Sequence, residues 1–152
     1  NFPTIRLSQL AVLYHANVNL FSKVIDANNL SDFHKLFSSE VSEYWKSRYV
    51  FDKESRLKSK KLSKSFVNLL VINVVIPMSF LYSKQRGENN VDYLIELLLQ
   101  IPSETNNIVD KFEFYKLKSN SAFDSQTLIH LKNHYCNHKR CLNCDIGLSL
   151  LK

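Results

Sequence analysis

The sequence predicts an all-α protein, with a single compact domain over residues 1–152 and about eight helices around a bent, buried central helix. The 152 residues include only 2 glycines and 3 prolines, too few for the regular turns of a multi-strand fold. Hydrophobic residues make up 45% and charged residues 22% of the chain, enough for one domain with a core. These figures exclude collagen-like, low-complexity and disordered proteins.

Apolar residues at helical spacing predict the helices of the first third of the chain. The predicted helices cover residues 4–14, 18–27 and 32–37, and a fourth helix begins at Ser39 or Ser42. Thr4 follows a proline and is a typical N-cap for the first helix, and Ser31 is one for the third. Residues 52–64 are predicted to be a solvated loop or an exposed helix end, because their apolar signal almost vanishes.

The central helix is predicted from the apolar run at residues 66–82, which is 17 residues long. That length falls just short of a membrane span, and Asn68 and Asn73 interrupt the run, so we expect a buried helix and no membrane partner. Its β-branched residues leave a buried strand as the alternative. Pro77 removes the amide that would donate to the Asn73 carbonyl, so the helix is expected to bend there.

Helices are also predicted for the remainder of the chain. They cover residues 91–101, a segment from Pro102 to about Lys116, a segment from Ser121 to Cys136 or His138, and one or two final turns between residues 141 and 151. Ser121 and Asp124 have the spacing of a capping box, in which the two side chains and two backbone amides bond reciprocally.

Three cysteines, Cys136, Cys141 and Cys144, lie within nine residues near the end of the sequence. Such a Cys-x4-Cys-x2-Cys run can supply three thiolates to zinc, with His138 or His134 as the fourth ligand. The alternative is that the three reduced thiols pack in a small core, since free cysteine is often buried. An odd cysteine count without a signal peptide predicts a reducing, cytoplasmic setting.

Three histidines recur every four residues, at His130, His134 and His138, and would share one helix face. Such a face can hold a metal where two neighbours converge. No HExxH motif accompanies them, so a solvated polar face is the favoured interpretation.

The net charge of +6 is concentrated in residues 53–64, which carry six basic residues and one acid, a local charge of +5. The basic residues are Lys53, Arg56, Lys58, Lys60, Lys61 and Lys64. Clustered cations of this kind favour nucleic acid by counterion release, and Trp45, Arg48, Tyr49 and Phe51 just upstream could stack on bases. The alternative is a solubilising loop whose neighbouring aromatic residues belong to the core.

No catalytic constellation is recognisable in the sequence. Gly87 and Gly147 stand alone, which excludes a glycine-rich phosphate loop. Glu40 and Glu43 lie one turn apart, but this spacing suits any exposed helix. The chain by itself is therefore not predicted to be an enzyme.

Several segments of the sequence resemble an uncharacterised bacterial protein family, over essentially the whole chain. They are Asn1-Phe-Pro-Thr-Ile-Arg-Leu-Ser-Gln-Leu10, Ser42-Glu-Tyr-Trp45, Ile72-Asn-Val-Val-Ile-Pro77, Asp124-Ser-Gln126, and Tyr135-Cys136 with Cys141-Leu-Asn-Cys144-Asp-Ile-Gly147. The three cysteines and Gly147 match the C-terminal motif of that family. Helical DNA-repair glycosylases also carry a cysteine cluster after a late helix, but theirs has four cysteines.

The resemblance implies that the chain, which starts at Asn1 and not at methionine, is the C-terminal helical half of a longer protein. The missing N-terminal half would resemble a PD-(D/E)XK-type nuclease core, and none of its catalytic residues lies in this chain. The expected function is an accessory module that binds nucleic acid beside that half. The alternative is a structural or protein-interaction domain with no ligand and no activity.

Overall fold

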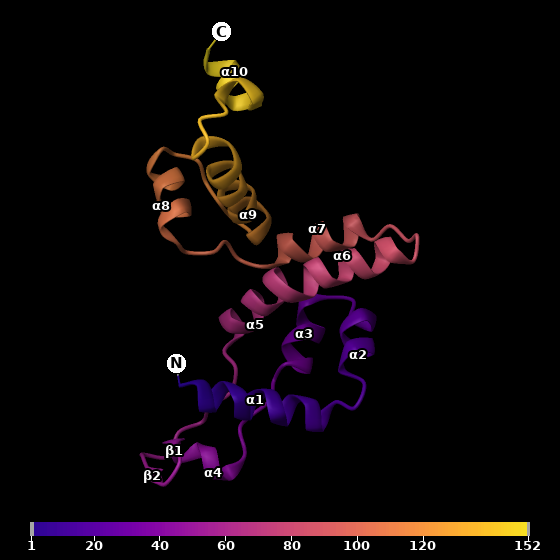
Figure 1. Cartoon of the computed structure of the whole chain (residues 1–152), viewed down its shortest axis with the longest axis vertical. Coiled ribbons are helices and arrows are strands. Elements are labelled where there is room, and N and C mark those ends of the chain that lie inside the picture. The colour runs from indigo at the N-terminus through magenta and orange to yellow at the C-terminus, as the bar shows by residue number, and fades with distance from the viewer. Residues whose placement is uncertain (1, 152) are drawn as a thin grey trace. The chain divides into compact units, whose positions relative to one another are not determined.

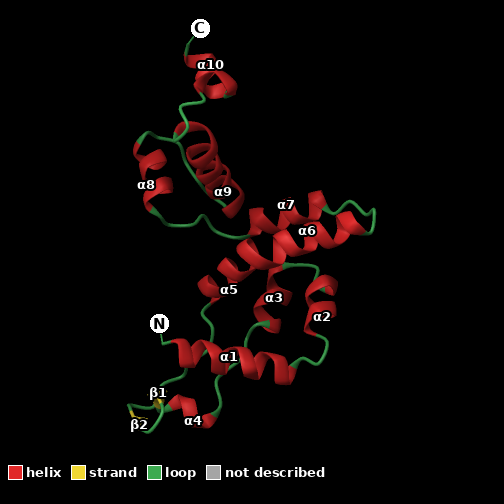
Figure 2. Cartoon of the chain, in the orientation of Figure 1, coloured by secondary structure: helices red, strands yellow, loops and turns green. Residues whose placement is uncertain are grey.

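The computed structural model describes residues 2–151, and 64% of the chain is helical (Figure 1, Figure 2). This part of the chain holds nine helices and one small two-strand hairpin, which confirms the predicted fold class. The chain divides into two compact units, Asn1–Asn89 and Asn90–Lys152. The prediction of one domain over residues 1–152 stays a prediction.

The first unit contains five helices and the hairpin. Its elements are α1 (Pro3–Ala16), α2 (Leu20–Asp26), α3 (Leu30–Leu36), α4 (Glu43–Lys46), β1 (Arg48–Val50), β2 (Lys53–Glu54), and one continuous helix made of α5 (Lys64–Leu70), the π-helical η1 (Val71–Val75) and α6 (Ile76–Gln85). Helix α1 buries Ile5, Gln9 and Leu13 at helical spacing. Its N-cap is Phe2, so the prediction that Thr4 caps it was wrong. The Thr4 hydroxyl donates instead to the carbonyl of Tyr49, a contact that only the folded chain creates.

Helix α3 buries Phe33, which is 1% exposed and is among the core residues of this unit. The cap of α3 is Asn29, whose side chain accepts from the Asp32 amide at 3.1 Å, and not Ser31 as predicted. His34 Nε2 lies 2.7 Å from Asn68 Oδ1, which joins α3 to α5. Asn68, which interrupts the apolar run in the sequence, is therefore paired between two helices.

The predicted fourth helix is a single turn, α4, and the chain then enters an antiparallel hairpin. Arg48 pairs with Glu54 and Val50 with Lys53 across strands β1 and β2. Asp52 takes a left-handed conformation at the turn, with φ of 58°. Aspartate tolerates this region without the help of glycine, which explains why a search for turn glycines does not reveal the hairpin. The strands are also too short for a visible alternation of polar and apolar residues.

The continuous helix spans Lys64–Gln85, 22 residues, and is bent, as predicted. Near its middle the Ile76 amide donates to the Val71 carbonyl, five residues back, as a π-helix requires. Pro77 follows directly and cannot donate to a carbonyl of the preceding turn. The π-helical turn and the proline thus lie together, and both are established causes of helix bending.

The buried face of this helix carries Val67, Val71, Ile72 and Val75, in agreement with the predicted central position. Phe80, which belongs to the apolar run predicted to be a buried helix, is 41% exposed. Only one face of the helix is therefore covered. By length and composition Lys64–Gln85 is also apolar enough to cross a membrane, a test that core helices of soluble proteins pass as well.

The second unit contains three longer helices and a short C-terminal turn of helix. Its elements are α7 (Val91–Gln100), α8 (Asn107–Phe114), α9 (Ala122–His130), the π-helical η2 (Leu131–Cys136), the 3₁₀ turn η3 (Cys141–Asn143) and α10 (Asp145–Leu150). Its core is formed by Leu94, Leu97, Ile101, Val109 and Ala122. No residue between Leu131 and Leu151 is fully buried, so the cysteine segment lies at the periphery of this core.

Helix caps in the second unit both confirm and correct the predictions. The capping box of Ser121 and Asp124 is present in full, and the helix that it opens continues through η2 to Cys136. Helix α8 begins at Asn107 rather than near Pro102, because Pro102 forms a β-bridge with Ser121. Asn106 caps α8 by accepting from the amides of its first turn.

Candidate functional site

The basic segment, residues 53–64, is fixed beside helix α4 by backbone hydrogen bonds. The Ser55 amide donates to the Ser47 carbonyl at 2.7 Å, and the Lys58 amide donates to the Lys46 carbonyl at 3.0 Å. After the hairpin, the chain therefore runs back along the element that precedes it. A segment that the sequence predicted to be a solvated loop is held in one place by its own backbone.

An aromatic cluster joins α4 to the hairpin: Tyr44 and Trp45 lie on α4, and Phe51 lies in the hairpin turn. The ring centroids of Trp45 and Phe51 are 5.0 Å apart, and those of Tyr44 and Trp45 are 5.1 Å apart, both edge-to-face. Phe51 is 67% exposed and Tyr44 is 40% exposed. The cluster therefore leaves part of its aromatic surface in contact with solvent. Tyr44 was not among the residues predicted to stack on bases, although its position next to Trp45 was a usable signal.

Lys60 differs from the other cations of the basic segment, because it is only 7% exposed. Its Nζ donates to the carbonyls of Arg48, at 2.7 Å, and Trp45, and lies 3.9 Å from the centre of the Tyr49 ring. Burial, with a smaller effect of Lys58, lowers the pKa of Lys60 below its usual range. Lys60 thus supports the hairpin from inside, and the interpretation of Lys60 as a surface contact for phosphate was wrong.

Tyr49 is also part of this interior and not of the exposed cluster. Its ring lies 4.9 Å from that of Phe2, and its carbonyl accepts from the Thr4 hydroxyl of α1. Of the four residues predicted to stack on bases, Trp45 and Phe51 are the two whose aromatic rings can still contact a base. Arg48 bonds to Glu54 and lies over Tyr44, with 4.5 Å from its guanidinium carbon to the ring centre.

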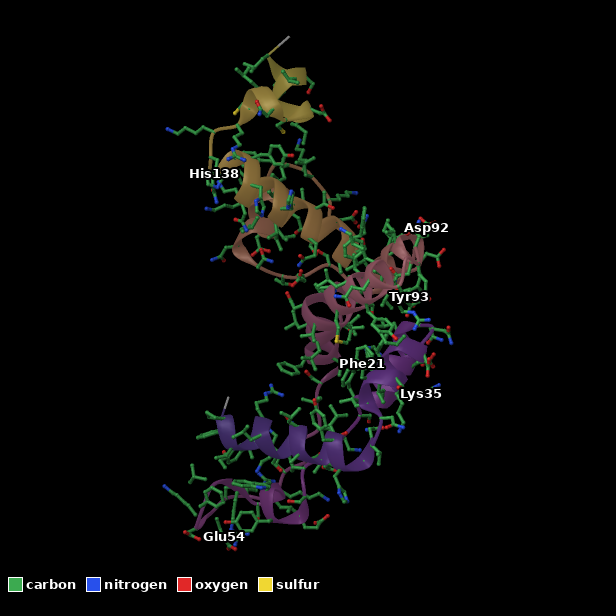
Figure 3. The ribbon with its side chains drawn as sticks, turned by 45° about the vertical axis from the view of Figure 1, so that its right-hand side comes forward. Phe21, Lys35, Glu54, Asp92, Tyr93 and His138 are labelled. Atoms are coloured by element: carbon green, nitrogen blue, oxygen red, sulfur yellow. The ribbon has the colours of Figure 1, made fainter. Side chains whose placement is uncertain are left out.

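The other five cations of the basic segment are exposed: Lys53, Arg56, Lys58, Lys61 and Lys64. Acidic residues reduce their combined field, since residues 40–64 contain eight basic and four acidic side chains, a net charge of +4. Glu54 projects from the hairpin (Figure 3). A hydrogen bond from Ser59, together with the charges of Lys46 and Lys61, holds the pKa of Glu40 below its usual range. The surface of residues 40–64 is therefore positive overall, but it also carries the carboxylates of Glu40 and Glu54.

The cysteines line one cavity of about 210 Å³ in the second unit, together with apolar side chains of α8, η2 and α10. Cys136 and Cys141 are exposed, Cys144 is half-buried, and all three are free thiols. Between residues 2 and 151, no group of three or more His, Cys, Asp or Glu side chains is placed to hold a metal ion. His138 lies in an exposed turn after η2 (Figure 3).

The three thiols share a cavity, but none of them is fully buried, so they do not form the small core that was the alternative prediction. The Cys₃His zinc site of Cys136, Cys141, Cys144 and His138 stays a prediction, which elemental analysis of the purified protein would test.

Two of the three helical histidines are stacked. The ring centroids of His130 and His134 are 4.4 Å apart with an interplanar angle of 26°. His138 lies beyond the end of η2, whose C-cap is Asn137. The predicted stripe is therefore a pair, because the helix ends before the third histidine.

Comparison with known protein families identifies one match, to a family described as "Protein of unknown function (DUF2851)", over residues 1–107 of the 152. The chain belongs to this family. The DUF2851 match includes the hairpin, the aromatic cluster and the basic segment, and it ends before the cysteines. The expected resemblance over the whole chain is thus shown for these residues alone. No curated protein matches the chain, and no solved structure does.

Proposed function

We propose that the first unit of this DUF2851 protein binds single-stranded nucleic acid at the hairpin surface, which we define as the aromatic cluster plus the five exposed cations of the basic segment. The observation that carries this proposal is the exposure of Phe51, in the hairpin turn, and of Tyr44, on α4, beside which backbone bonds fix the basic segment. Binding of a single strand uses aromatic rings for its bases and cations for its phosphates, which explains why exposed rings and a fixed basic segment lie side by side.

Single strands fit this surface better than duplexes. Bases of a single strand are free to stack on aromatic side chains, and such stacking contributes about 1–3 kcal/mol per base with little dependence on sequence. The bases of a duplex are stacked on each other, so Phe51 cannot stack on them. Helix α4, which carries Tyr44 and Trp45, has four residues and is too short to act as a recognition helix in a major groove.

The cations favour the same ligand through its phosphates. Each Lys or Arg that neutralises a phosphate releases a condensed counterion, and this gain requires no defined geometry from the side chain. Lys53, Arg56 and Lys58 are the exposed cations nearest in sequence to the hairpin turn. The backbone amide of Lys58 also donates to the Lys46 carbonyl of α4. They would contact phosphates while Phe51 and Tyr44 contact bases.

Fluorescence anisotropy with a labelled single-stranded oligonucleotide of mixed sequence tests the proposal. Phe51→Ala is expected to weaken binding by about tenfold, which corresponds to the loss of one stacked base. Phe114→Ala is the matched control, because Phe114 is 82% exposed on α8 and lies outside the hairpin surface. Equal binding by both variants, or no binding by the native chain at low salt, would contradict the proposal.

The second candidate function is protein interaction, and a groove in the first unit favours it. The groove has a volume of about 460 Å³. Its apolar lining includes Val18, Phe21, Phe37, Val74 and Met78. Val18 is 92% exposed, and Phe21 packs edge-to-face on Tyr82 with ring centroids 5.1 Å apart. Val18→Asp would weaken the binding of a protein partner at this groove and leave binding to the oligonucleotide unchanged.

The proposal extends to the longer protein only through the resemblance of the sequence. That resemblance supports a nuclease-like half upstream, to which the hairpin surface would present a strand. Sequencing the reading frame upstream of Asn1 tests this part, since a PD-(D/E)XK pattern is either encoded there or not. The binding experiment above does not depend on its result.

A further inference from the structure

We propose that Cys141 and Cys144 form a reversible disulfide, so that the C-terminal turn of the second unit is a redox-sensitive modification site. The inference concerns a different unit from the hairpin surface and does not depend on nucleic-acid binding. It rests on three observations: the local backbone geometry, the close packing of Gly147, and the exposure of the thiols.

The backbone between the two cysteines is a single tight turn. Cys141–Asn143 is a 3₁₀ helix, and the Cys144 amide donates to the Cys141 carbonyl at 3.3 Å. In a 3₁₀ turn, the side chains of residues i and i+3 lie one above the other. Turns of this type hold the two Cα atoms within about 7 Å, and disulfides span about 4.4–6.8 Å between Cα atoms. The pair can therefore close without a rearrangement of the chain.

Gly147 holds this turn in place. A Cβ atom at position 147 would lie 2.3 Å from the Cys141 carbonyl oxygen and 2.9 Å from its carbonyl carbon. Only glycine allows the first turn of α10 to pack directly on the backbone of Cys141. The Leu148 amide also donates to the Cys144 carbonyl at 2.8 Å. Both cysteines are thus fixed by backbone contacts, and their relative position does not depend on a flexible loop.

The thiols are accessible to a small oxidant. Cys141 is exposed and Cys144 is half-buried, and both line the cavity that also contains Cys136. Exposed cysteines exchange with disulfides, whereas buried ones are inert. Cys136 belongs to a separate element, η2, and four residues separate it from Cys141. The single turn favours Cys141 and Cys144 as partners, and leaves Cys136 outside the pair.

The oxidant is a low-molecular-weight disulfide of the glutathione class. The exposed Cys141 thiolate attacks one sulfur of the oxidant, which breaks the S–S bond, releases one glutathione thiol and forms a mixed disulfide. The Cys144 thiolate then attacks the Cys141 sulfur and displaces the second glutathione. The two cysteine thiols lose two electrons and two protons, and one glutathione disulfide becomes two glutathione thiols.

Peptide mapping tests this pairing, because Lys139 and Arg140 lie between Cys136 and the other two cysteines. Trypsin therefore separates Cys136 from a peptide that contains both Cys141 and Cys144. The reduced full-length chain would be incubated with glutathione disulfide, quenched with acid, alkylated and digested. The expected result is an internal disulfide in the C-terminal peptide, with Cys136 in its own peptide, either alkylated or carrying glutathione.

Serine variants sharpen the test. Cys136→Ser is expected to form the same internal disulfide, and either Cys141→Ser or Cys144→Ser is expected to lose it and to retain glutathione as a mixed disulfide. A cross-linked pair of peptides that includes Cys136 would overturn the proposal. So would three alkylated thiols, or glutathionylation of the native chain without closure, in excess oxidant. Reduction by dithiothreitol should restore three thiols.

Discussion

Lys60 contributes its charge to the interior of the first unit, where its ammonium group satisfies two backbone carbonyls and faces the ring of Tyr49. Its own carbonyl accepts from Gln9 Nε2 of α1 at 2.6 Å. A lysine that looks like one member of a basic run therefore joins the hairpin to the first helix. Buried hydrogen bonds of a charged donor contribute about 1.5–3 kcal/mol each.

Lys60→Ala is expected to lower the free energy of unfolding of the first unit by about 3 kcal/mol, because two carbonyls lose their charged donor. Lys58→Ala is the matched control, since Lys58 is exposed, and its effect should stay within about 0.5 kcal/mol. Urea denaturation followed by the fluorescence of Trp45, the single tryptophan, measures both. Equal midpoints for the two variants would show that the contacts of Lys60 contribute no stability.

Gly147→Ala is expected to displace α10 from the Cys141 backbone, at a cost of about 1–3 kcal/mol, since the added Cβ overlaps a backbone atom. Hydrogen exchange of the Leu148 amide, which donates to the Cys144 carbonyl, should become faster. Gly87→Ala is the control, because Gly87 has a positive φ of 71° but no atom within 4 Å of the added Cβ. Its cost, about 1–2 kcal/mol, comes from backbone conformation alone. Unchanged exchange at Leu148 in Gly147→Ala would argue against the close packing.

Among the elements, those fixed by local chemistry are the ones that the sequence predicts well. The capping box of Ser121 and Asp124 and the helix of residues 66–82 depend on spacing within one segment, and both are present. The hairpin and the interior position of Lys60 depend on contacts with Tyr49 and α1, far away along the chain. Such contacts leave no periodic signal, so the sequence alone led to a loop and a surface lysine.

Asp124 makes the stability contributed by the capping box dependent on pH. Hydrogen bonds from the backbone amide of Asn120 and from Ser121 lower the pKa of the Asp124 carboxyl, against a smaller opposing effect of burial. A carboxyl whose pKa is lower in the folded state stabilises the fold above its unfolded pKa, and this contribution disappears as the pH falls through the folded pKa.

Asp124→Asn is therefore expected to destabilise the second unit at neutral pH, and the difference from the native chain should shrink as the pH falls below about 4. Asp110→Asn, in the first turn of α8, is the control, because Asp110 belongs to no capping box. Circular dichroism in urea at several pH values measures the effect. A difference that is constant between pH 7 and pH 2 would contradict the assignment.

The continuous helix Lys64–Gln85 combines a π-helical turn with a proline at the next position but one. Each residue of an α-helix turns the chain by about 100°, so one additional residue in a turn changes the face that all later residues present. The π-helical turn thus sets which face α6 buries, where Ser79 and Ser83 point inward. The sequence predicted the bend from Pro77 and did not reveal the π-helix that precedes it.

At the scale of the whole molecule, the positive charge is concentrated in one unit. Five exposed cations of the basic segment can neutralise at most five phosphates of a single strand, each with a salt slope of roughly 0.7. The logarithm of the binding constant should therefore fall with the logarithm of salt concentration, with a slope between zero and roughly −3.5. Anisotropy titrations at several salt concentrations measure the slope.

Lys58→Ala is expected to reduce this slope by roughly 0.7, and Lys84→Ala, at an exposed position of α6, should leave it unchanged. A native slope near zero would exclude phosphate contacts and favour the protein-interaction function. A slope that both variants reduce equally would indicate a diffuse attraction by the net charge, without a defined surface.

The two units also carry different chromophoric and reactive groups. Trp45 lies in the first unit, and all three cysteines lie in the second. A maleimide acceptor attached to a single retained cysteine, such as Cys136 in a variant that lacks the other two, would receive energy from Trp45 across the boundary between the units. The native sequence thus provides an internal donor and an attachment site for an acceptor, so that the separation between the units can be followed as nucleic acid is added, without the introduction of a new tryptophan or cysteine.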